Sequence, residues 1–124
     1  MQKVKLGVLL VGVSDLNKAR PFYENVFGIK VTDFRPPFMQ GELGNIEFNI
    51  EENAPYRSSD WGIKNIGNRK SFTFQVGDIF KFLEDAEKAG AKVVEKPIKQ
   101  EWGWYDAVIA DMDGNEFVIE QEIN

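Results

Sequence analysis

The sequence predicts an α+β fold built from two tandem βαβββ modules, whose curled mixed sheets surround a shared cleft. One observation is a repeat: EFNIE at residues 47–51 returns as EFVIE at 116–120, with only the middle residue changed. Another is that VSDLNK at 13–18 resembles VGDIFK at 76–81. Such internal repeats indicate a duplicated unit. They predict one domain, with module one at about 1–52, a linker at about 53–68 and module two at about 69–124.

Each predicted module consists of a strand, a helix and three further strands. Gly28 and Gly90 follow the two helical patterns, and glycine readily adopts the left-handed conformation that ends a helix. Gly-Asn pairs precede the last strand of each module and favour tight reversals. Pro21 is expected in the opening turns of the first helix, where a missing N–H is tolerated. The predicted elements are strand 3–13, helix 15–27, strands 28–34, 38–43 and 45–51, then strand 69–77, helix 78–89, and strands 91–95, 103–110 and 115–121.

Strand alternation predicts which side chains face the helices. In both EFxIE strands the Phe and the Ile point to one face, and the glutamates and the middle residue point to the other. Helices cover the apolar face of each sheet. The middle residues, Asn49 and Val118, are therefore expected on the cleft side of the sheets. The neighbouring glutamates share that side: Glu47, Glu51, Glu116 and Glu120.

Composition excludes several kinds of chemistry. The chain has no cysteine, so it has no disulfide and no thiolate nucleophile, and it has no histidine to act as a general base or metal ligand. A metal would need an all-oxygen shell. The net charge of −5 argues against a nucleic-acid partner. The apolar N-terminal run is too short to span a membrane, so no membrane partner and a cytoplasmic location are expected.

Three segments from both modules stand out as a set: VGVSDLNKARPFYENVFGIKV at 11–31, FQVGDIFKFLEDAEKAGAKV at 74–93 and DMDGNEFVIEQ at 111–121. In these segments the chain resembles the vicinal oxygen chelate superfamily, which includes glyoxalase I, extradiol dioxygenases, fosfomycin-resistance proteins and bleomycin-binding proteins. The resemblance implies the glyoxalase/bleomycin-resistance fold over nearly the whole chain. It also implies a cleft at the interface of a homodimer.

The same resemblance implies where a divalent metal would bind in the enzymes of the superfamily. The corresponding positions here are Val8, Asn49, Ser71 and Val118. Two valines cannot ligate a metal, and the other two side chains are weak neutral ligands. We therefore expect no metal, no cofactor, and no glyoxalase or dioxygenase activity at this position. The cleft glutamates could hold Ca²⁺ or Mg²⁺ elsewhere, or could simply be exposed near the sheet ends.

Metal-free relatives imply a small-molecule-binding protein of the bleomycin-resistance type, which would sequester a flat, cationic antibiotic or metabolite. The acidic charge would attract such a ligand. The alternative is a metal-independent or atypical-metal enzyme, an isomerase or lyase that uses the cleft carboxylates. The sequence leaves open whether any turnover occurs.

Aromatic residues gather in the loops expected near the cleft, around Phe38, in the linker and in QEWGWYDA at 100–107. Flat rings stack on heteroaromatic ligands and attract cations. Trp102 and Trp104 are separated by one residue, so on an extended segment both would face one side and form a stacking wall. Alternatively, the tryptophans pack a dimer interface or seal the linker. The predicted ligand-binding residues are Trp104, Trp102, Phe38, Asn49, Ser71, Glu47, Glu116 and Trp61.

Overall fold

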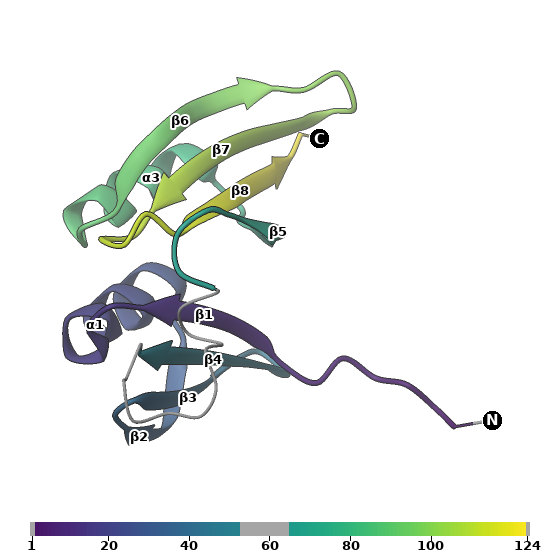
Figure 1. Ribbon diagram of the computed structural model, residues 1–124. Coiled ribbons are helices and arrows are strands. Elements are labelled where there is room, and N and C mark those ends of the chain that lie inside the picture. The colour runs from purple at the N-terminus through teal and green to yellow at the C-terminus, as the bar shows by residue number, and fades with distance from the viewer. Residues whose placement is uncertain (1, 53–64, 124) are drawn as a thin grey trace.

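The computed structural model describes residues 2–52 and 65–123, and it confirms the predicted α+β fold of two βαβββ modules (Figure 1). The first module contains β1 (Leu9–Val13), α1 (Leu16–Phe27), β2 (Lys30–Arg35), β3 (Phe38–Leu43) and β4 (Ile46–Glu52). The second contains β5 (Arg69–Gln75), α3 (Ile79–Lys88), β6 (Lys92–Lys99), β7 (Trp104–Ala110) and β8 (Glu116–Glu122).

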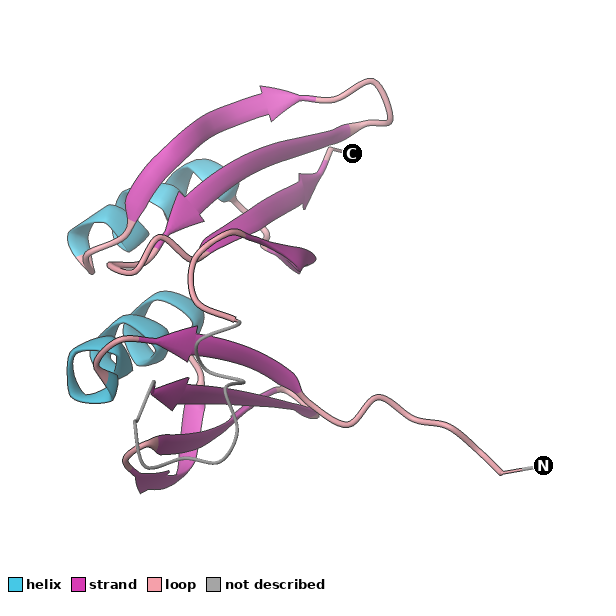
Figure 2. Ribbon diagram, in the orientation of Figure 1, coloured by secondary structure: helices cyan, strands magenta, loops and turns pink. Residues whose placement is uncertain are grey.

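Each module forms one four-stranded sheet, and the strand orders are equivalent. Sheet A has the order β1-β4-β3-β2, and sheet B has the order β5-β8-β7-β6. In both sheets the first strand pairs parallel with the last, and the remaining pairs are antiparallel. The helices α1 and α3 lie on the same side of the two sheets (Figure 2). We call the other side of each sheet, which neither of these helices covers, its open face.

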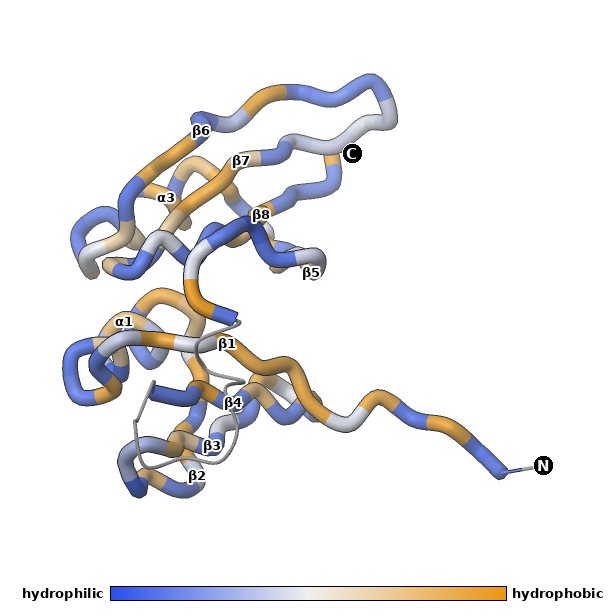
Figure 3. The backbone as a smooth tube through the Cα atoms, in the orientation of Figure 1, coloured by the Kyte–Doolittle hydropathy of each residue, from blue (hydrophilic) through white to orange (hydrophobic). Residues whose placement is uncertain are grey.

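The predicted alternation of side chains is confirmed in both EFxIE strands. Phe48, Ile50, Phe117 and Ile119 are completely buried beneath the helices. Asn49 and Val118 therefore lie on the open faces, because successive side chains of a strand point to opposite sides. The hydropathy of the backbone shows apolar segments concentrated where the strands pass beneath the helices (Figure 3).

The first strand is shorter than the sequence predicts. β1 begins at Leu9, which pairs with Phe48, instead of at Lys3. Its partner β4 begins at Ile46, which by this register would lie beside Gly7, so the described residues before Gly7 have no β4 residue opposite them. Residues 2–8 are exposed, and they continue away from sheet A in an extended path (Figure 1).

The two helices begin with the same pair of contacts. The Asp15 carboxylate accepts a hydrogen bond from the Lys18 amide at 3.0 Å, and Asp78 accepts one from Lys81 at 3.1 Å. These are ordinary N-terminal caps. The last strand of each module supplies a second acceptor: Glu52 binds the Leu16 amide at 2.7 Å, and Gln121 binds the Ile79 amide at 2.8 Å. The duplication thus extends to individual hydrogen bonds.

Pro21 lies deeper in α1 than the first turn. It is the sixth residue of the helix, which continues without a break to Phe27. The N–H that it lacks would have bonded to the carbonyl of Asn17, and Asn17 is exposed, so water can reach that carbonyl. Gly28 then ends the helix with a φ of 71°, as the sequence predicts.

Aromatic side chains from both modules form one shared core. Phe27 of α1 stacks on Phe74 of β5, with ring centroids 4.1 Å apart. Phe117 of β8 contacts Tyr23 and Phe27 edge-on, and Phe48 of β4 packs against Phe74. Neither module therefore buries its apolar face without the other.

A buried polar network joins the modules beside this core. The Tyr23 hydroxyl donates to the Asp111 carboxylate at 2.6 Å, and Asn115 donates to the same carboxylate and to the Gly12 carbonyl of β1. Burial, and then the Asp111 charge, raise the pKa of Tyr23 well above its ordinary value, so the hydroxyl remains a donor. No helix in the described part of the chain is long and apolar enough to cross a bilayer.

Candidate ligand-binding site

The open face of sheet A contains a pocket of about 270 Å³. It forms where β2, β3 and β4 lie side by side. The register places Gln40 opposite Asn49, and Phe38 opposite Glu51, so these four side chains share one face. Met39 and Ile50, whose side chains alternate toward the helix-covered face, also contribute to the lining. The complete lining is Asp33, Arg35, Phe38, Met39, Gln40, Glu47, Asn49, Ile50 and Glu51.

The polar side chains of this pocket are arranged by hydrogen bonds along β4. The Asn49 amide nitrogen donates to Glu47 at 2.8 Å, and its oxygen accepts from the Gly41 amide at 3.4 Å. Glu51 is only 7% exposed although it lines the pocket. A carboxylate so deeply placed interacts more strongly with a cation than one in water does.

The pocket is negatively charged. Its lining has three carboxylates and one guanidinium. That guanidinium, of Arg35, pairs with Asp33 at 2.7 Å. The other two carboxylates of the lining belong to Glu47 and Glu51. Phe38, which is 44% exposed, adds an aromatic surface at the rim.

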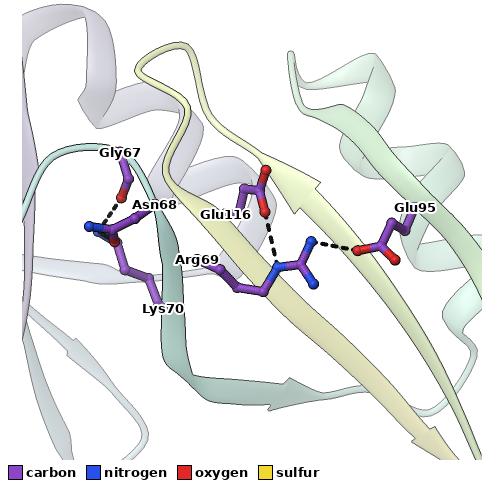
Figure 4. Close-up of polar contacts among 6 residues, drawn as sticks. All are labelled: Gly67, Asn68, Arg69, Lys70, Glu95 and Glu116. Carbon is purple, nitrogen blue, oxygen red and sulfur yellow. Dashed lines mark hydrogen bonds and ion pairs between the residues drawn. The ribbon is translucent and has the colours of Figure 1, made fainter.

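The open face of sheet B differs because an arginine crosses it. Arg69 of β5 binds Glu116 of β8 at 3.0 Å and also pairs with Glu95 of β6 (Figure 4). These hydrogen bonds raise the pKa of the guanidinium. Glu116 is the counterpart of Glu47 in the repeat, whereas the counterpart of Arg69 is Leu6 when Val76 is aligned with Val13. Module one therefore keeps an acidic pocket where module two has ion pairs.

A groove of about 340 Å³ separates β1 from β5. Val8 and Ser71 both line it, together with Lys70. The Lys70 ammonium donates to the carbonyls of Asn65 and Gly67 at 2.7 and 2.8 Å, and also to Asn68 (Figure 4). Burial lowers the pKa of Lys70. These bonds hold the start of β5 against the residues that precede it. Lys70 therefore stabilises the wall of the groove.

The sequence of the chain and its fold agree with one family. A sequence model of the Glyoxalase/Bleomycin resistance protein/Dioxygenase superfamily matches residues 5–119, which is nearly the whole chain. The chain belongs to this superfamily. No curated protein matches the sequence.

Solved structures of superfamily proteins share the fold. A glyoxalase/bleomycin resistance protein/dioxygenase family enzyme from Burkholderia phytofirmans PsJN has a TM-score of 0.81 at 22% identity, covering 97% of this chain and 100% of that one. A superfamily member from Sphaerobacter thermophilus gives 0.75 at 20% identity, covering 97% and 98%. TioX from Micromonospora sp. ML1 gives 0.75 at 17% identity, covering 97% and 100%. At these identities the likeness shows the fold alone.

The four positions that correspond to superfamily metal ligands do not form one donor set. Val8 and Ser71 line the groove between β1 and β5, and Asn49 lines the sheet A pocket. Val118 lies between Thr73 and Val108 on the open face of sheet B. Within residues 2–52 and 65–123, no group of three or more acidic side chains could hold a metal ion. The donors present here do not suit a divalent metal.

Three predicted site residues of this superfamily member come together, and the others do not. Phe38, Glu47 and Asn49 line the sheet A pocket. Ser71 lies in the groove, and Glu116 is held by Arg69. Trp61 lies outside the described residues. Six lining residues are missing from the predicted site, although Glu51 was expected on the cleft side: Asp33, Arg35, Met39, Gln40, Ile50 and Glu51. Gln40 could have been predicted from the sequence. Counting outward along the two strands from the Gly44-Asn45 turn sets Gln40 opposite Asn49.

The prediction that Trp102 and Trp104 share one face of an extended segment is wrong. β7 begins at Trp104, and Trp102 lies in the turn before it. The turn closes through a hydrogen bond from the Gln100 amide to the Trp104 carbonyl at 2.7 Å, and Gly103 adopts a φ of 88°. Trp102 is 66% exposed at the tip of the β6–β7 hairpin. Both tryptophans belong to the second module, whereas the pocket lies in the first. Their role in ligand binding stays a prediction.

Proposed function

We propose that the chain is a binding protein for a small, flat cation, which it holds in the sheet A pocket without a metal ion. The observation that carries this proposal is Glu51, a carboxylate that is 7% exposed and still lines the pocket beside Glu47. A cation that enters would lie beside these two carboxylates at a site where water screens charge poorly.

The rest of the lining supports a ligand that is flat as well as cationic. Phe38 stands on the same face as Glu51, so a ring or a guanidinium-like group can stack on it while its charge meets the carboxylates. Gln40 and Asn49, the next pair on the same face, add amide groups to the lining. The volume of about 270 Å³ lies just below the usual range for ligand pockets. It suits the cationic end of a larger molecule.

A matched pair of probes tests this proposal. Benzamidine is a flat cation, and benzamide has nearly the same shape without the charge. We expect titration calorimetry to detect benzamidine and to detect benzamide far more weakly, because only the first carries charge to Glu51. Equal affinities, or no benzamidine binding at millimolar concentration, would contradict the proposal. Release of a chemically altered ligand would instead favour an enzyme.

Variants locate the binding. Glu51→Gln keeps the shape of the side chain and removes its charge, so it should weaken benzamidine binding by roughly 10- to 100-fold, or about 1.4–2.8 kcal/mol. Phe38→Leu should weaken it less, by roughly 0.5–1 kcal/mol. Glu101→Gln, which removes an exposed charge from the other module, is the control and should leave the affinity unchanged. Melting curves of each variant check that the fold is intact.

A further inference from the structure

In the first module, a cation of the chain itself joins the helix to the edge strand of the sheet. The Arg20 guanidinium of α1 lies over the Phe34 ring of β2, with Cζ 4.6 Å from the ring centroid. Its Nε also pairs with Glu24, one helical turn further on, at 3.1 Å. One cation is therefore held by an aromatic face and a carboxylate together.

The second module has the carboxylate without the cation. Its helix α3 begins with the same cap contact as α1, so Asp78 corresponds to Asp15 and the two helices align at a constant offset (78 − 15 = 63). At this offset Glu87 corresponds to Glu24, but Leu83 takes the place of Arg20. Among the described residues, Glu87 takes part in no ion pair.

A pocket of about 380 Å³ opens where the second module lacks this arginine. It lies between α3 and β6, the edge strand of sheet B (Figure 1). Two apolar side chains of each element line it: Phe80, Leu83, Val93 and Pro97. The volume falls within the usual range for small-molecule pockets.

The charged side chains of this pocket leave it acidic. Glu84 and Glu87 contribute two carboxylates, and Lys96 of β6 contributes one ammonium. Lys96 forms no ion pair with either glutamate, and Glu84 pairs with the exposed Lys88 of its own helix at 3.5 Å. Phe80 lies on the same side of α3 as the glutamates, because the three residues are spaced by four and by three positions.

We propose that the pocket between α3 and β6 binds a small molecule that has a guanidinium or ammonium group on an apolar chain. Its cation takes the role of the Arg20 guanidinium, pairing with Glu87 and lying on the Phe80 ring, which is 56% exposed. Its apolar chain packs against Leu83 and Val93. The site is independent of the proposed function, because the sheet A pocket shares none of its lining residues.

A charged probe and its neutral counterpart test the site by amide NMR titration. Butylguanidinium resembles the Arg20 side chain, and butylurea has nearly the same shape without the charge. We expect butylguanidinium to shift the amide signals of residues 80–87 and 93–97 with millimolar affinity, and butylurea to bind at least about fivefold more weakly. No saturable shifts in these two segments, or equal affinities, would overturn the proposal. A capped Gly-Arg-Gly peptide that bound more tightly than butylguanidinium would assign the pocket to a protein partner and would also overturn it.

Matched variants locate the cation. Glu87→Gln should weaken butylguanidinium binding about three- to fivefold. Asp85→Asn is the control and should leave it unchanged, since Asp85 belongs to the same helix but pairs with Lys81 and does not line the pocket. Equal affinities of these two variants would contradict the proposal.

Leu83→Arg supplies the residue of the first module, and the folded variant should no longer bind butylguanidinium. Wild-type affinity in this variant, once its melting curve shows that it is folded, would also contradict the proposal. Glu51→Gln should leave the shifts of residues 80–87 unchanged, although it weakens benzamidine binding. Failure of one site is thereby distinguished from failure of the other.

Discussion

Asp111→Ala should lower the melting temperature by roughly 10–20 °C, because it removes the acceptor at the centre of the network between the modules. Asp111 is 7% exposed. Its carboxylate accepts hydrogen bonds from the Tyr23 hydroxyl, from the Asn115 side chain, and from the backbone amides of Asp113 and Asn115. The substitution removes the acceptor of the buried Tyr23 hydroxyl and Asn115 amide and of the part-buried Asp113 amide, at a cost of about 3–5 kcal/mol.

Asp113→Ala is the matched control for this prediction. Asp113 belongs to the same turn, but its carboxylate bonds only to the exposed Ser14, at 2.6 and 3.0 Å. Its loss should cost less than about 1 kcal/mol. Tyr23→Phe removes a single donor and should fall between the two variants. Equal melting temperatures for Asp111→Ala and Asp113→Ala would show that the network contributes nothing to stability.

Phe117→Ala should cost about 3–5 kcal/mol of unfolding free energy, because it opens a cavity in the shared aromatic core. The Phe117 ring is fully buried. Its centroid lies 5.1 Å from that of Phe27 in the first module, and 5.8 Å from that of Phe74 in the second. Denaturant titration, followed by both circular dichroism and tryptophan fluorescence, measures the loss.

The control for the core substitution is Phe80→Ala. Phe80 is 56% exposed and its one ring contact is the edge of Tyr105, so its removal should cost less than about 1 kcal/mol. Phe117→Ala should move both spectroscopic transitions together. If the two transitions were separate and only one of them moved, the two modules would be unfolding independently. The shared core would then not couple their unfolding.

The order of the elements and the faces of the strands follow from local pattern alone. A strand repeats every two residues, so Phe48 and Phe117 share a face with the isoleucines of their strands, opposite the glutamates. The helix ends follow from Asp15 and Gly28 for the same local reasons. The duplication supports these predictions further, because the strand pattern and the helix-end residues occur once in each module.

The joining of the two modules depends on contacts that no local pattern specifies. Tyr23 and Asp111 lie 88 positions apart, and only the packing of α1 against the second module brings them together. The start of β1 was predicted too early because alternation continues through Leu6 and Val4, although no neighbouring strand follows it. The shared face of Trp102 and Trp104 was expected only for an extended segment, whereas the residues just before Trp104 form a turn.

The shared aromatic core bears on the origin of the duplication. A half-length ancestor with one βαβββ unit would have left the equivalent of Phe27 and Phe48 facing water, because the rings that cover them, Phe72 and Phe74, come from the other half. Such an ancestor could have been stable only as a pair of identical chains. Gene fusion then made that pairing permanent, and each half became free to change its own open face. One half kept an acidic pocket, and the other closed its equivalent with Arg69.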